Sequence, residues 1–190
     1  MGEFSLALDG PRGAEPELTV VEPDARARAL VSDHFDFVWR LIRRLGVPAA
    51  DADDAAQQVF IVGTRRLADI PVGGERTFLY GSALRIAATM RRNSARRERF
   101  MRSVSVETDD SVRTPHQEFE RRQALAFLDQ ILNLMDGDQR DVFVLCEIEE
   151  LSAPEVASIV AVPVGTVASR LRRARQTFTK QLERLKAQFT

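Results

Sequence analysis

The residues best suited to recognition chemistry are arginines near the carboxyl end of the chain. Residues 163–186 carry seven basic side chains against the single acid Glu183. Guanidinium groups bind phosphate oxygens and can donate two parallel hydrogen bonds to the edge of a guanine. The polar and basic residues expected on the outer surface of this segment are Thr166, Ser169, Arg170, Arg172, Arg173 and Gln176. Their types and order predict a helix that lies against double-stranded DNA.

The stretch from Ser152 to Gln176 has the signals of a helix, a tight turn and a second helix. Ser152 and Glu155 have the spacing of a capping box at the start of the first helix. That helix must end ahead of Pro163, because the residue before a proline is pushed out of the helical region. Pro163 suits the first position of the second helix, and Gly165 leaves its first-turn amides open to a phosphate. The inward stripe of the second helix is Val167, Leu171, Ala174 and Phe178. A buried hairpin with solvated arginines is the simpler alternative.

A second run of arginines lies at residues 76–102, where eight arginines accompany a single acid. The apolar spacing predicts a long helix over 78–97, after a loop at 69–77. The outer ridge of this helix is Arg85, Thr89, Arg92, Asn93 and Arg96. A helix that begins with aromatic residues and continues with arginines suits single-stranded or melted DNA. Packing of Phe78 and Tyr80 into the core is an equally good interpretation.

The overall composition excludes several classes of protein. The chain has 27 Lys and Arg residues and 28 Asp and Glu residues, so its total charge does not indicate a protein that binds nucleic acid. The clustering of basic residues in two segments does indicate contact with a polyanion. Cys146 is the only cysteine, which excludes an intrachain disulfide and predicts a buried, inert thiol. His34 and His116 have no clustered partners, so no metal and no other cofactor is expected. No apolar run has the length of a membrane span and no secretory pattern is present, which favours a soluble, cytoplasmic protein.

The hydrophobic pattern is helical throughout and predicts an all-α protein with two small domains. Residues 1–24 are rich in Gly, Pro and acids and are expected to form a mobile extension. The first domain is expected at 25–98 and the second, which contains the helix–turn–helix, at 120–190. A flexible acidic linker at 99–119 would join them.

One helix of the first domain, expected from about Asp51 to Ala68, has a polar face. Asp51 or Asp53 would be its cap. The residues that line up on this face are Asp54, Gln57, Gln58, Ile61 and Arg65. The exposed Ile61 points to a docking surface, although a merely solvated face explains the pattern as well. Trp39, in the preceding helix, is expected to pack in the core.

Three motifs together resemble the extracytoplasmic-function (ECF) sigma factors, the smallest class of bacterial sigma factors. They are Asp51-x-Asp53-Asp54-x-x-Gln57-x-Val59-Phe60, then Thr77-Phe78-Leu79-Tyr80 with its arginine-rich helix, and Pro163-Val164-Gly165-Thr166-Val167-x-Ser169-Arg170-Leu171-x-Arg173-Ala174-Arg175. The resemblance covers roughly residues 28–188. It implies a transcription-initiation subunit that binds core RNA polymerase, directs it to promoters and helps to open the duplex.

The resemblance also implies a role for each group of residues. Sigma region 2 would occupy 25–98 and sigma region 4 would occupy 120–190. The clamp helices of the largest polymerase subunit would be met by Asp54, Gln57, Gln58, Ile61 and Arg65. The melted −10 element would be contacted by Ile70, Arg76, Phe78, Arg85, Thr89, Arg92, Asn93 and Arg96, with a flipped base held by the loop at 69–77. The double-stranded −35 element would be contacted by Pro163, Gly165, Thr166, Ser169, Arg170, Arg172 and Arg173. An anti-sigma factor would cover one or both DNA-binding domains.

Four residues depart from the pattern usual in that family, among them Ala168, whose side chain is shorter than the one that often faces DNA there. Phe78 stands in place of a tryptophan, Arg85 in place of an asparagine and Ala161 in place of the turn glycine. Ala161 must either avoid a positive φ or hold a modest strain. Two alternative functions account less well for the sequence. A helix–turn–helix regulator that acts without the polymerase core would be expected to carry a receiver or ligand domain, which 25–97 does not resemble. An enzyme would need a nucleophile–base set, phosphate loop or metal cluster, and none is present, so no catalytic residue is expected.

Overall fold

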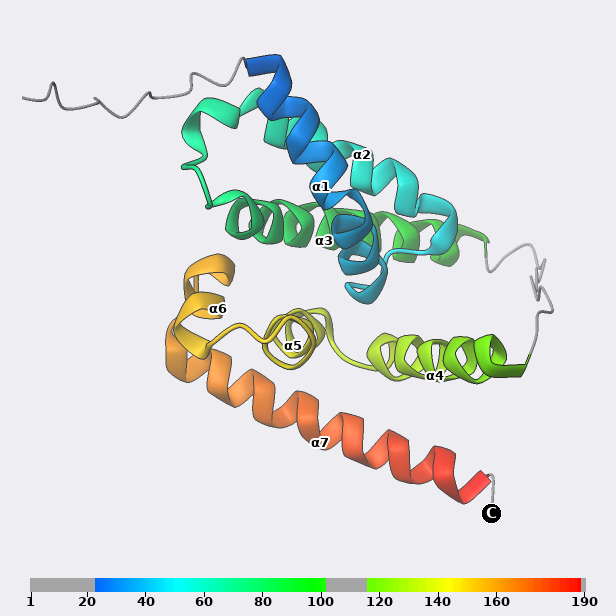
Figure 1. Ribbon diagram of the computed structural model, residues 1–190. Coiled ribbons are helices and arrows are strands. Elements are labelled where there is room, and N and C mark those ends of the chain that lie inside the picture. Colours follow the sequence, from blue (N-terminus) through cyan, green and yellow to red (C-terminus); the bar gives the residue numbers. More distant parts are fainter. Residues whose placement is uncertain (1–22, 102–115, 189–190) are drawn as a thin grey trace, which may run out of the picture.

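The chain folds into helices that form two halves, one packed on the other (Figure 1). The computed structural model describes residues 23–101 and 116–188. The first half contains α1 (Pro23–Arg44), α2 (Ala49–Arg65), a 3₁₀ turn (Leu67–Asp69) and α3 (Glu75–Met101). The second half contains α4 (His116–Asn133), α5 (Gly137–Phe143), a π-helical turn (Val144–Ile148), α6 (Ala153–Val160) and α7 (Val164–Gln188). Every regular element in these two stretches is helical, which confirms the predicted all-α class.

The helices extend into both ends of the range predicted as a linker. Helix α3 continues to Met101 and α4 already begins at His116, whereas the linker was expected at 99–119. The remainder of that range lies outside the described residues, as does nearly all of the predicted N-terminal extension. The division of the chain into two domains, with the boundaries given above, stays a prediction.

The start of α2 differs from the prediction. Neither Asp51 nor Asp53 is the cap, because the helix begins at Ala49 with Pro48 in the N-cap position, at φ −55° and ψ 152°. A proline suits that place, since first-turn amides need no partner within the helix. Asp53 instead accepts a hydrogen bond of 2.8 Å from Nε1 of Trp39, which is half-buried rather than fully in the core. This bond ties α1 to α2.

The helix–turn–helix of the second half has the local geometry that its sequence predicts. The Ser152 amide donates to Oε2 of Glu155 over 2.8 Å, so the capping box is confirmed. Helix α6 ends at Val160, and Ala161 adopts the left-handed conformation at φ 54° and ψ 46°. Of the two alternatives for Ala161, the structure therefore has the strained one, because a Cβ in this region is disfavoured.

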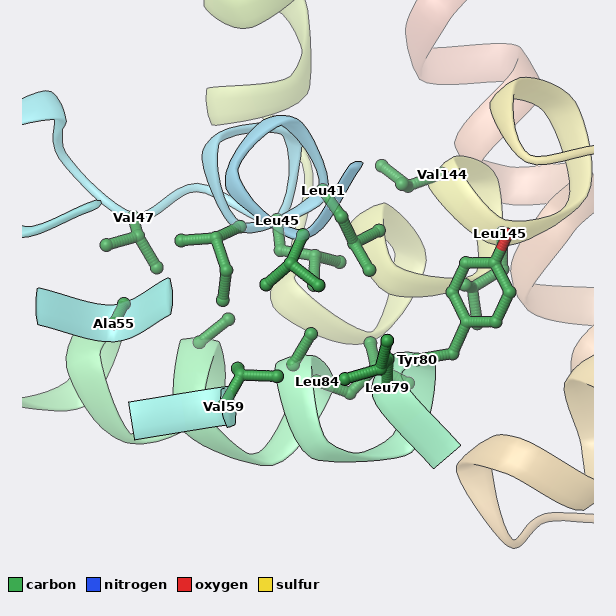
Figure 2. Close-up of a cluster of buried hydrophobic side chains, with 14 of the residues drawn as sticks. Leu41, Leu45, Val47, Ala55, Val59, Leu79, Tyr80, Leu84, Val144 and Leu145 are labelled. Carbon is green, nitrogen blue, oxygen red and sulfur yellow. The ribbon is translucent and has the colours of Figure 1, made fainter. Parts of the chain in front are cut away.

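The two halves share one hydrophobic core. Figure 2 shows a cluster that takes side chains from both of them. Leu41 and Leu79 of the first half and Val144 and Leu145 of the second are fully buried in it, and Tyr80 is nearly so. Helix α3 contacts α6, and α1 contacts α4. We call this contact between α1–α3 and α4–α7 the junction.

Candidate nucleic-acid and polymerase interfaces

The polar face of α2 is exposed along its length. On the opposite side of the helix, small residues and Val59 are buried. This side packs against α1 and α3, which fixes the orientation of α2. The structure brings all five predicted docking residues to the surface, namely Asp54, Gln57, Gln58, Ile61 and Arg65. Ile61 is 42% exposed, so an apolar side chain lies open among polar ones. Such a surface suits a protein partner that covers the isoleucine.

Phe35 of α1 extends this exposed surface and was not identified from the sequence as part of it. Its ring is stacked on Phe60 of α2, with the ring centroids 6.2 Å apart, and it remains 42% exposed. In the sequence, Phe35 falls within the apolar pattern of α1, and this pattern gave no sign that it would be left uncovered. Aromatic side chains are enriched at protein interfaces, so Phe35 joins the candidate docking residues.

The loop between α2 and α3 is held in shape by Arg26, a residue that the sequence analysis did not single out. Its guanidinium donates to the carbonyl oxygens of Leu67 (3.2 Å) and Ile70 (2.6 Å). It also pairs with Oε1 of Glu75 at 2.9 Å. Burial raises the pKa of Glu75, but hydrogen bonds from Arg26 and from backbone amides outweigh burial, so that the pKa is lowered overall. No local motif reveals Arg26, because its acceptors lie more than forty residues along the chain.

Ile70 was predicted to contact the −10 element, but its side chain does not lie at the surface. Ile70 is only 2% exposed and packs in the core, as expected for an aliphatic side chain that anchors a loop. Val72, at the tip of the same loop, is 90% exposed and is followed by Gly73 at φ 82°. The apolar surface that this loop offers to a ligand is therefore that of Val72.

The ridge on α3 is formed as predicted. The side chains of Arg85, Thr89, Arg92, Asn93 and Arg96 are all exposed along it. Thr89 Oγ1 donates to the carbonyl of Arg85 (3.0 Å) and accepts from Arg92 Nη2 (3.1 Å). These hydrogen bonds order part of the ridge before any ligand binds. Three exposed arginines beside a hydroxyl and an amide can bind the phosphates of a single strand.

The aromatic residues at the start of α3 have different environments. Tyr80 is 3% exposed, so the core interpretation holds for it. Phe78 is half-buried, with the Arg66 guanidinium 5.8 Å from its ring centroid. Arg76 is exposed to solvent, but its guanidinium lies 4.5 Å from the Phe37 ring centroid and 3.7 Å from Oε2 of Glu149. Arg76 is thus already in contact with the second half.

The outer face of α7 carries most of the predicted −35 residues. Pro163, Gly165, Ser169, Arg172 and Arg173 are exposed, and Thr166 and Arg170 are half-buried. A Cβ built on Gly165 would meet nothing within 4 Å, so the helix start is open to a large ligand. Arg172 and Arg173 are adjacent and exposed, and a major groove is wide enough to admit an α-helix that carries such side chains.

Other arginines of α7 are held by acids of the same half. Arg170 forms an ion pair with Asp138, and Arg175 pairs with Glu147 at 2.6 Å. Cys146 is half-buried next to this group. Burial, and then the charge of Glu147, raise the pKa of its thiol, which keeps it protonated and unreactive.

Neither a metal centre nor a membrane-spanning element is found in the described chain. Residues 23–101 and 116–188 contain no group of three or more His, Cys, Asp or Glu that could hold a metal ion. No helix in these ranges has the length and apolar character needed to cross a bilayer.

Comparison with known proteins finds similarity to RNA polymerase sigma factors. The family described as sigma-70, region 4, matches residues 128–178. The ECF RNA polymerase sigma factor SigE of Mycolicibacterium smegmatis is 32% identical over 151 residues, which is 77% of this chain but only 58% of that protein. The RNA polymerase sigma-H factor of Pseudomonas aeruginosa is 31% identical over 157 residues, covering 76% of this chain and 80% of that protein.

Two solved structures share the fold of this chain. The sigma factor RpoE of Bartonella quintana, solved in complex with the anti-sigma factor NepR, gives a TM-score of 0.64 at 18% identity and covers 82% of this chain and 96% of that one. CnrH, solved with the cytosolic domain of CnrY, gives a TM-score of 0.62 at 24% identity and covers 85% of this chain and 90% of that one.

Proposed function

Because the chain belongs to the ECF sigma factors of RNA polymerase, we propose that it binds the polymerase core through α2 and carries it to promoters that it helps to open. The observation that carries this proposal is the pairing of two surfaces on one chain. One is the exposed face of α2 with its open Ile61, and the other is the arginine face of α7. A regulator that binds DNA without the polymerase would need only the second.

The core enzyme would dock on α2 through its clamp helices. Asp54, Gln57, Gln58 and Arg65 supply polar contacts around Ile61, and Phe35 adds an aromatic edge. This arrangement, a small apolar centre with a polar rim, is common where two proteins bind reversibly.

Promoter DNA would contact both halves. In the first half, Arg85, Thr89, Arg92, Asn93 and Arg96 would hold the melted −10 strand, beside the loop that Arg26 positions. Arg76 would join them where the DNA displaces Glu149, and Phe78 offers an aromatic edge. In the second half, Arg172 and Arg173 would enter the major groove of the −35 element, while Gly165 and Pro163 lie close to its phosphates.

Two further features follow from this role. The polymerase core would supply the bond-forming chemistry, so we expect no catalytic residue in this chain. We also expect the protein to act in the cytoplasm, where the polymerase core acts. The Bartonella relative was solved with an anti-sigma factor, and we propose that a protein of that kind also binds this chain across its DNA-binding surfaces.

Run-off transcription tests the proposal directly. Purified chain and core polymerase are mixed with DNA taken from upstream of the chain's own gene. We expect a discrete transcript that core polymerase alone does not make. If no such transcript forms on this or on genomic fragments, the proposed function is wrong.

Two sets of variants divide the function between the two surfaces. Replacing Gln57 and Ile61 together with Ala should weaken core binding at least tenfold in a fluorescence titration, because the apolar centre of the face is lost. Arg173→Ala should weaken promoter binding by about 1–3 kcal/mol if Arg173 reads a base. Arg184→Ala, which removes an exposed charge farther along α7, is the matched control and should do neither.

A further inference from the structure

A cavity near the carboxyl ends of α1 and α4 is lined mainly by polar and basic side chains. Its volume is about 470 Å³, which lies within the range of about 300–1,000 Å³ common for small-molecule sites. The charged and polar residues of its lining are Arg43, Arg91, Arg140, Asp129, Ser94 and Asn133. None of them belongs to the candidate docking, −10 or −35 residues. Three guanidinium groups against one carboxylate give the lining two excess positive charges.

Arg140 is the most buried of the three arginines, at 6% exposed. Its Nε donates to the carbonyl of Leu132 over 2.6 Å and its Nη1 to the carbonyl of Leu45 over 3.3 Å, so one guanidinium serves the carboxyl ends of α4 and α1 together. Nη2 has no acceptor among residues 23–101 and 116–188. No buried side-chain nitrogen in these ranges lacks a partner, so Nη2 is not buried. The cavity that Arg140 lines is therefore where Nη2 can meet a ligand.

Positive charge is concentrated around this cavity. Burial, and then the charge of Arg91, lower the pKa of Arg140, and Asp141 and Asp129 offset this only in part. The guanidinium nevertheless stays protonated, as arginine does in proteins. Arg91 pairs with Asp141 at 2.9 Å, but Asp141 does not line the cavity. An anion inside the cavity would therefore balance a charge that now has only carbonyl acceptors in the described chain.

The carboxylate of the lining, Asp129, is held only weakly. The distance from its Oδ2 to Nη2 of Arg43 is 3.5 Å. Burial raises the pKa of Asp129, although the charges of Arg43, Arg44 and Arg140 act against this. A phosphate can accept two parallel hydrogen bonds from one guanidinium. A phosphate would thus compete successfully with Asp129 for Arg43.

The backbone around the cavity also suits an anion. Gly46 lines it at φ 87°, and a Cβ built on this residue would overlap the guanidinium of Arg140. A glycine is therefore needed for Arg140 to occupy this position. Pro48, also in the lining, is the N-cap residue of α2. The positive end of the dipole of α2 consequently lies beside the same space.

We propose that this cavity binds a small phosphorylated molecule, whose phosphate is held by Arg43, Arg91 and Arg140. A phosphate monoester or a diphosphate brings the two or more negative charges that the lining lacks. Ser94 and Asn133 add a hydroxyl and an amide for the remainder of the ligand. The ligand contacts both halves of the chain, so its binding stabilises the fold. The site shares no residue with the proposed polymerase and DNA surfaces and does not depend on the proposed function.

Isothermal titration calorimetry of the full-length chain at physiological ionic strength tests the proposal. The probes are orthophosphate, pyrophosphate, AMP and ADP, with adenosine as the uncharged comparison. We expect saturable binding of at least one phosphorylated probe and none of adenosine. A preference for AMP or ADP identifies a nucleotide as the ligand, and a preference for orthophosphate or pyrophosphate identifies an inorganic anion. If none of the four anions binds, or if adenosine binds as well as AMP, the proposal is overturned.

Two pairs of variants with matched charge locate the binding site. Arg43→Gln should weaken binding of the preferred probe at least about tenfold, whereas Arg40→Gln, exposed on the same helix outside the cavity, should leave it unchanged. Asp129→Asn should tighten binding about threefold or more, because the competing carboxylate is lost. The exposed Asp36→Asn is its control. A purely structural Arg43–Asp129 pair would give no such gain. Equal effects in a variant and its control overturn the proposal.

Circular dichroism checks that each variant keeps its helices. If Arg43→Gln loses helix content, Ser94→Asp takes its place, because it puts a carboxylate into the cavity, and the exposed Ser32→Asp is its control. The same criteria then apply. Run-off transcription separates the two proposals, because a missing transcript refutes the proposed function and leaves the calorimetric result valid.

Discussion

Arg26→Ala should loosen the loop between α2 and α3 while leaving the surrounding helices folded. The wild-type guanidinium makes three contacts, two with loop carbonyls and one with Glu75. A hydrogen bond of this type contributes about 1 kcal/mol net, and an ion-paired one somewhat more. The side chain is partly exposed, so solvent replaces some of what is lost. We therefore expect the free energy of unfolding to fall by about 2–3 kcal/mol.

The local effect can be measured separately from the global one. Hydrogen exchange of the amides in residues 67–77 should accelerate at least tenfold more in Arg26→Ala than exchange in α1 and α2. Arg28→Ala, an exposed arginine two residues along the same helix, is the matched control and should change neither stability nor exchange. Arg26→Lys should be intermediate, because an ammonium cannot reproduce the planar fork that reaches both carbonyls.

The functional effect follows from the same contacts. If the loop holds a flipped base, Arg26→Ala should slow promoter opening, followed by permanganate reactivity of unpaired thymines, with core affinity unchanged. The reasoning is refuted if the loop amides exchange at the wild-type rate in Arg26→Ala. It is also refuted if opening is normal although the loop is demonstrably loosened.

Three further changes test local features. Ala161→Gly should raise stability by about 1 kcal/mol in thermal unfolding, since glycine removes the left-handed strain at φ 54°; a loss of stability would contradict the strain. Gly46→Ala should lower the free energy of unfolding by about 3 kcal/mol, because φ is 87° and the new Cβ displaces Arg140. Denaturant titration measures this change, and an unchanged stability would exclude the close contact between Gly46 and Arg140. The pKa of Glu75 is lower in the folded chain than in the unfolded one, so ionised Glu75 stabilises the fold at pH values above the ordinary pKa of a glutamate. This stabilisation is lost as the pH falls through the pKa that Glu75 has in the folded chain. A titration from pH 6 to 3 should therefore show less acid destabilisation in Glu75→Gln than in wild type.

Much of the helical architecture was accessible from the sequence because its signals are local. The Ser152–Glu155 capping box, the end of α6 ahead of Pro163 and the exposed face of α2 depend on residues a few positions apart. Spacing of three and four residues is enough to assign them. The predicted start of α2 was too late in the chain, because Asp51 and Asp53 are both good capping residues. In the structure Pro48 is already the N-cap residue, and both aspartates lie inside the helix.

The remaining features depend on contacts between distant residues, which no local pattern records. Arg26 reaches acceptors in another helix's loop, and Ile70 is buried by neighbours that the sequence does not place beside it. The junction is the largest such case. Arg91 and Asp141 are each unremarkable charged residues on helical patterns, and only the folded chain brings them within 2.9 Å.

The double role of Arg140 limits how freely the halves of such proteins can be exchanged. Its guanidinium completes the end of α4 in its own half and the end of α1 in the other, against a glycine. A hybrid built from this first half and a foreign second half would leave the Leu45 carbonyl without that donor. Fusing genes for halves of different origin would then yield chains whose halves fold but no longer pack on each other. Such a fusion would need to keep Arg140, Leu45 and Gly46 together.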